Sequence, residues 1–169
     1  DQADKEFWRR ERIANSTPAK DISKLHYLTI PLDKFPFGFS SDPEIIAIEN
    51  EIKELSDQEI VNFSGITNTE LKTMYGLPNF EKLSQMGDCY DRLVVLLNSY
   101  AKILIDQGKT QEAIGILEYS VGTKTDVSES YILLADCYKA NSEGKKLDLL
   151  KEQVNNSNLM LKDSILAKL

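Results

Sequence analysis

The sequence predicts an all-α fold of stacked helical hairpins, preceded by an extended N-terminal arm. Two observations carry this prediction. Apolar residues recur at helical steps in two similar segments that lie 34 residues apart. The stretch 25–39 is also apolar, but prolines and a glycine interrupt it and no partner strand follows. One amphipathic hairpin cannot bury its own apolar face, so we expect the two hairpins to stack on each other.

The two similar segments cover about 94–127 and 128–157. Gly108 lies in a polar turn of the first segment, where a glycine suits the left-handed conformation that ends a helix. Ala101 and Ala135 are small where two helices must approach closely. Large residues occupy the equivalent positions around them in the two copies: Leu97, Tyr100 and Leu104 in the first, and Tyr131, Leu134 and Tyr138 in the second.

This pattern resembles the tetratricopeptide (TPR) repeat, a 34-residue pair of helices. The first copy matches better in its turn and second helix, through Gly108, Ala113 and Leu117, and the second copy matches better in its first helix. The chain departs from the pattern at Leu104, which replaces a tyrosine, and no proline closes either copy. The resemblance implies an α-solenoid fragment that binds other proteins. An unrelated helical bundle is the alternative.

In TPR proteins the first helix of each repeat lines a binding groove. The resemblance implies that the groove of this chain is lined by residues of mixed charge and polarity: Val95, Asn98, Lys102 and Ile105 in the first copy, and Glu129, Ile132, Asp136 and Lys139 in the second. This set does not reproduce the Lys/Asn clamp that holds a C-terminal carboxylate in some TPR domains. Ordinary solvated surface is the alternative interpretation of these residues.

Two further stretches, 30–38 and 60–83, resemble bacterial membrane-anchored TPR-like proteins that have no established activity. The resemblance implies a membrane helix before Asp1. The basic start of the chain agrees with it, because the segment from Lys5 to Lys24 carries six Lys/Arg and three acids beside Phe7 and Trp8. We therefore expect the cytoplasmic face of the cell membrane if the chain is anchored, and otherwise the cytoplasm. A frayed surface helix is the alternative for residues 1–14.

We expect residues 1–41 to form this basic helix and the arm, and residues 42–169 to form the helical domain. Asp42 and Pro43 predict a helix start, and Thr67 with Glu70 predicts a capping box. From Phe80 to Leu104 an apolar stripe predicts one continuous or kinked helix, with a break at Gly87 as the alternative. Residues 126–129 predict another capping box, and a C-terminal capping helix should run from 157 or 158 to 169.

Composition argues against several functional classes. The chain has 169 residues and a formal net charge of −7, and residues 42–70 alone hold eight acids and one lysine. An acidic chain does not suit nucleic acid, whose phosphates require a basic surface. The string Gly108-Lys109-Thr110 is not a phosphate loop, because Ile103 stands where the motif needs glycine. His26 has no catalytic or metal-binding companions, and the two cysteines are not spaced as metal ligands.

We therefore expect a scaffold without cofactors or enzymatic activity that binds a protein or peptide. The alternative is a structural domain without a groove that forms a homodimer by pairing its apolar stripe, residues 80–104, with that of a second copy.

Overall fold

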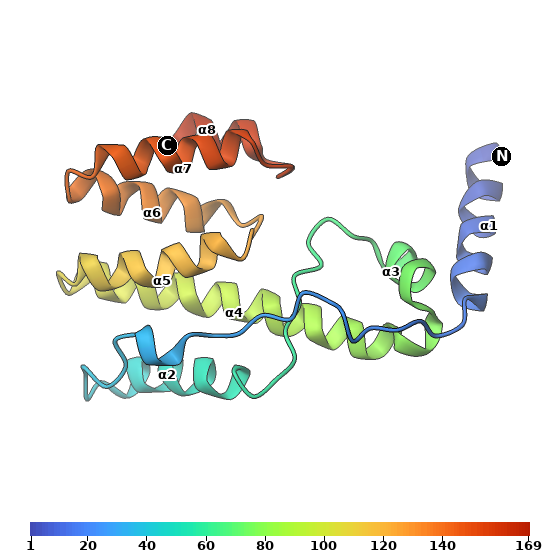
Figure 1. Cartoon of the computed structure of the whole chain (residues 1–169), viewed down its shortest axis with the longest axis horizontal. Coiled ribbons are helices and arrows are strands. Elements are labelled where there is room, and N and C mark those ends of the chain that lie inside the picture. Colours follow the sequence, from blue (N-terminus) through green and yellow to red (C-terminus); the bar gives the residue numbers. More distant parts are fainter. The chain divides into compact units, whose positions relative to one another are not determined.

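The computed structural model describes all residues from 1 to 169 and confirms the all-α class. It contains eight α-helices and no strands (Figure 1). The α-helices are α1 (Gln2–Ser16), α2 (Pro43–Leu55), α3 (Asn68–Tyr75), α4 (Phe80–Asp106), α5 (Thr110–Gly122), α6 (Ser128–Ala140), α7 (Gly144–Asn155) and α8 (Lys162–Lys168). Two short 3-10 helices, η1 (Leu32–Lys34) and η2 (Leu77–Asn79), lie in the connections.

The chain divides into two compact units. Unit 1 comprises Asp1–Leu28 and Glu59–Tyr90, and unit 2 comprises Thr29–Gln58 and Asp91–Leu169. This division differs from the boundary at residue 41 that the sequence indicates, because the arm and α2 group with the C-terminal helices. The helix α4 is continuous through Gly87, and its residues are divided between the two units.

Unit 1 is built on the packing of α1 against α3. The predicted cap of α3 is present, since the Thr67 hydroxyl accepts the backbone N–H of Glu70 at 3.1 Å. Val61, Leu83 and Met86 form a small buried core, against which Phe63 and Tyr75 pack. At the end of α3 the chain turns at Gly76, whose φ of +92° requires glycine. That turn lies against Pro18 and Ala19, the residues that follow α1.

Unit 2 is a stack of helices. Successive helices α5, α6, α7 and α8 pack on one another, and Figure 1 shows them layered in chain order. Gly108, with φ +73°, provides the tight turn between α4 and α5, and Ser142, with φ +55°, that between α6 and α7. Ala101 and Ala135 are fully buried. The small side chains therefore lie inside the stack, where close approach of the helices requires them.

The extended arm packs on this stack. Ile30 and Phe35 are buried, and the Phe37 ring lies 5.6 Å from the Tyr100 ring. The Tyr119 hydroxyl donates to the backbone carbonyl of Thr29 at 2.9 Å. Only η1 is regular within the arm, so side chains rather than a strand ladder hold it in place.

Two expected helix starts are wrong. No side chain caps α6, which begins at Ser128 after Val127 rather than after Asp126. The Thr125 hydroxyl instead accepts the Val127 N–H at 3.1 Å, which shifts the start by one residue. The last helix begins only at Lys162, because the polar residues 155–158 and a turn precede it.

Candidate functional site

Two surfaces of unit 2 are candidates for a binding site. The first is the predicted groove face, formed by α4 and α6. The second is a pocket between α5, α6 and α7 that the sequence did not predict. Both lie within one compact unit, so their geometry can be compared directly.

One predicted groove residue is not available at the surface. Asn98 is only 3% exposed, and its side-chain oxygen accepts the hydroxyl of Ser130 on α6 at 2.9 Å. This bond joins α4 to α6 inside the stack. The expectation that Asn98 lines a groove must be corrected, because a buried polar side chain needs a partner within the protein and Asn98 has found one.

The remaining groove residues are divided between paired and open positions. Lys102 and Glu129 form an ion pair with each other at 2.8 Å, so their charges are mutually compensated. Val95 is 52% exposed. Ile105 and Ile132 are half-buried, and Asp136 and Lys139 are exposed. The polar contacts between α4 and α6 thus bring Asn98, Lys102 and Glu129 into one region. The other predicted groove residues make no polar contact with these three: Val95, Ile105, Ile132, Asp136 and Lys139.

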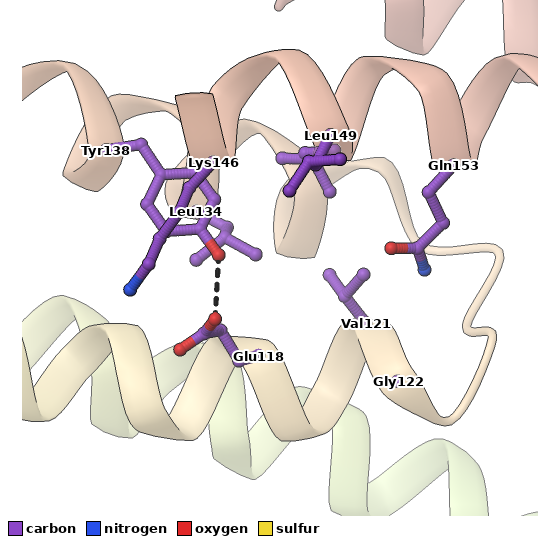
Figure 2. Close-up of a pocket in the computed structure, with 9 residues that line it drawn as sticks. Glu118, Val121, Gly122, Leu134, Tyr138, Lys146, Leu149 and Gln153 are labelled. Carbon is purple, nitrogen blue, oxygen red and sulfur yellow. Dashed lines mark hydrogen bonds between the residues drawn. The ribbon is translucent and has the colours of Figure 1, made fainter. Parts of the chain in front are cut away.

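The second candidate is a pocket of about 330 Å³, within the size range of small binding sites. Figure 2 shows its walls, with α5 on one side, α7 on the other and α6 behind. Its lining combines an apolar centre with polar ends: Glu118, Val121, Gly122, Leu134, Tyr138, Lys146, Leu149, Leu150 and Gln153.

The apolar centre contains both buried and exposed leucines. Leu134 and Leu150 are buried in the stack, whereas Leu149 on α7 is 64% exposed. Leu149 lies outside the stripe of α7 that packs inward, which consists of Leu150 and Val154. An apolar side chain at the mouth of a pocket offers area that a partner can cover.

One end of the pocket carries a fixed carboxylate. The Tyr138 hydroxyl donates to Oε2 of Glu118 at 2.9 Å, as drawn in Figure 2. Burial of Tyr138, and then its bond to Glu118, raise the pKa of the phenol well above its usual range, so it remains a donor at neutral pH. Lys146 pairs with Glu143 at 3.2 Å. The Glu118 carboxylate has no ion-pair partner in the chain, and the charge at this end is negative.

The sequence interpretation missed this pocket because the TPR resemblance directs attention to the first helix of each repeat. Most of the lining comes from the second helices, α5 and α7. A usable signal was Leu149, an apolar residue adjacent to the periodic stripe of its helix rather than on it.

We also considered metal binding, thiol reactivity and membrane spanning. No group of three or more His, Cys, Asp or Glu side chains is arranged to hold a metal ion. Burial raises the pKa of both free thiols, Cys89 and Cys137, which disfavours the reactive thiolate. None of the helices combines the length and apolar character needed to cross a bilayer.

Comparisons with protein-family models, characterised proteins and solved structures found no match to this chain.

Proposed function

We propose that this chain is a non-enzymatic interaction scaffold whose TPR-like hairpins, in unit 2, bind a peptide segment of a partner protein. The observation that carries the proposal is the pocket between α5, α6 and α7, with its exposed Leu149 and its carboxylate at Glu118. Pockets with an apolar centre and a few placed polar groups are the usual form of binding sites. The pocket supports binding better than the α4–α6 face, where Lys102 and Glu129 already satisfy each other.

A displayed random-peptide library, selected on the immobilised full chain, tests this function. Two variants assign any binding to a surface: Leu149→Ser at the pocket and Val95→Ser on the α4–α6 face. Both side chains are more than half exposed, so neither substitution should disturb the core. We expect selected peptides to lose affinity for Leu149→Ser and to retain it for Val95→Ser. The reverse result would move the site to the α4–α6 face, and a selection without binders would contradict the function.

Pairing of two copies through the apolar stripe has less support. Its residues Leu83, Leu97 and Leu104 are fully buried within the chain itself. A second copy could reach them only after local unfolding, which makes a dimer of that kind costly. Light scattering of the purified chain should therefore give the mass of a monomer, and a stable dimer would revive the structural alternative.

We further propose that the chain works at the cytoplasmic face of a membrane. The support comes from α1, on which Phe7 and Trp8 are 54% and 60% exposed. Lys5 and Arg12 lie three residues before and four after Trp8, on the same side of the helix, and neither has an ion-pair partner. Tryptophan next to basic residues suits the membrane interface, and Lys/Arg are enriched on its cytoplasmic side.

A further inference from the structure

The pocket of unit 2 has at one end an exposed carboxylate, Glu118, of which one oxygen is not used by the chain. Oε2 of Glu118 accepts the Tyr138 hydroxyl at 2.9 Å, and this bond fixes the direction of the carboxylate. The other carboxylate oxygen accepts no hydrogen bond from the chain. Lys146, the one cation among the lining residues, is paired with Glu143 at 3.2 Å. The end of the pocket is therefore prepared for a positive group brought by a partner.

The apolar centre lies next to this carboxylate. Glu118 and Val121 are three residues apart on α5, which places them about 4.5 Å apart along the helix axis. On α7 the lining runs from Lys146 through Leu149 to Gln153, a length of about 10 Å. Figure 2 shows Glu118 and Tyr138 at one end, Leu149 and Val121 in the middle, and Gln153 at the other end.

These lengths match an extended peptide. At roughly 3.3 Å per residue, three residues cover the length of the pocket, and side chains two positions apart point to the same face. Gln153 is exposed, and its side-chain amide makes no hydrogen bond within the chain. Its amide can therefore pair with the backbone of such a segment, which leaves two side chains to enter the pocket.

Resting on the proposed peptide-binding function, we infer that the pocket selects an extended segment in which an apolar residue stands two positions from a lysine or arginine. The apolar side chain packs between Val121, Leu134 and Leu149, and the cation pairs with Glu118. The Glu118 carboxylate, which has no ion-pair partner in the chain, favours a basic segment over an acidic one at this end of the pocket.

Three short capped peptides, identical except at two positions, test this specificity. The first contains Leu-Ser-Arg, the second Leu-Ser-Glu and the third Ala-Ser-Arg, each between glycine-serine flanks. Each is titrated into the full chain while methyl NMR signals of Val121, Leu134 and Leu149 are followed. We expect the Leu-Ser-Arg peptide to shift these signals, and the other two to bind at least fivefold more weakly, since each loses one of the two contacts.

A matched pair of variants identifies the carboxylate. Glu118→Gln and Glu112→Gln each remove one negative charge from an exposed position of α5, but only Glu118 lines the pocket. Glu118→Gln should weaken binding of the Leu-Ser-Arg peptide about two- to fivefold. The ratio of the affinities of the Ala-Ser-Arg and Leu-Ser-Arg peptides should stay unchanged, because both carry the arginine. Glu112→Gln should have no effect. Equal weakening by both variants would show a diffuse charge effect and overturn the specific role of Glu118.

The outcomes separate this inference from the proposed function. If library peptides bind at the pocket but Leu-Ser-Arg and Leu-Ser-Glu bind equally, the charge specificity is wrong and the binding function stands. If library peptides bind and are lost with Val95→Ser only, the pocket is not the site and the inference falls. If neither library nor designed peptides bind, both proposals fail.

Discussion

Different interactions stabilise the interior of each of the two units. Unit 2 has an apolar interior in which Leu97, Ile114 and Leu117 are fully buried. Unit 1 has a small core, and polar contacts join its distant segments: Lys72 reaches Asn15 at 3.1 Å, and the Asn79 side chain donates to the carbonyl of Lys20 at 2.9 Å. Unit 2 should therefore respond mainly to changes of core volume, and unit 1 mainly to changes of backbone fit.

The largest expected effect concerns the turn at Gly76 in unit 1. A Cβ at this position would lie 2.7 Å from Ala19 Cα and still closer to the Pro18 carbonyl, and φ is +92°. Because backbone atoms cannot move aside easily, Gly76→Ala should cost about 3–5 kcal/mol, from strain and overpacking together. Hydrogen exchange by mass spectrometry should show unprotected amides in unit 1 and unchanged protection in α5 and α6.

Gly65→Ala is the matched control. Gly65 has φ +81°, but no atom lies within 4 Å of an added Cβ. Its substitution should cost only the conformational strain, about 1–2 kcal/mol. Equal effects of the two substitutions would show that the approach of Gly76 to Pro18 does not stabilise unit 1. Loss of protection in α5 and α6 as well would contradict the division into units.

The next effect compares two tyrosine–glutamate bonds within unit 2. The Tyr100 hydroxyl donates at 2.5 Å to Glu49, which is 3% exposed and otherwise receives only the Gly38 N–H. Tyr100→Phe removes the donor of the shorter hydrogen bond to this buried carboxylate and should lower the free energy of unfolding by about 2–3 kcal/mol. Tyr138→Phe frees the exposed Glu118, which water can then solvate, so it should cost less than about 1 kcal/mol.

Urea unfolding followed by circular dichroism measures both costs. Similar midpoints for Tyr100→Phe and Tyr138→Phe would show that the buried bond from Tyr100 to Glu49 stabilises unit 2 no more than the exposed bond from Tyr138 to Glu118.

A smaller effect tests the stacked helices of unit 2. Ala135 is fully buried on α6, so Ala135→Phe should overpack the stack and cost about 1–3 kcal/mol. Ala140→Phe, at the exposed end of the same helix, serves as the control and should leave the unfolding midpoint almost unchanged. An unchanged midpoint for Ala135→Phe would contradict close packing of α6 in the stack.

The contrast between the units also explains what the sequence could predict. Unit 2 follows helical periodicity, so its helices, the turn at Gly108 and the buried alanines were predictable. The start of α6 was not, because no side chain caps this helix and the Thr125 hydroxyl bonds the Val127 N–H just before it. In unit 1 the decisive contact, Gly76 against Pro18, joins residues far apart in sequence. The pocket likewise depends on Glu118, Tyr138 and Leu149 from three helices, which no local pattern relates.

The smallest effect concerns the surface of unit 1. Trp8 is the single tryptophan of the chain, so its fluorescence reports directly on α1. Its ring lies edge to face against Phe7 at 5.1 Å, in contact with water. If α1 docks on a membrane, phosphatidylcholine vesicles containing phosphatidylserine should shift the Trp8 emission to the blue, and pure phosphatidylcholine should shift it less. The cause is the attraction of Lys5 and Arg12 to the anionic lipid, worth about 1 kcal/mol per charge at an anionic surface.

A matched pair of variants tests the role of these charges. Lys5→Gln should weaken vesicle binding about fivefold, whereas Lys145→Gln, which removes an exposed charge from α7 in unit 2, should not. An emission maximum that neither vesicle alters would contradict the membrane proposal and leave the peptide-binding proposal for unit 2 intact, because the two depend on different residues.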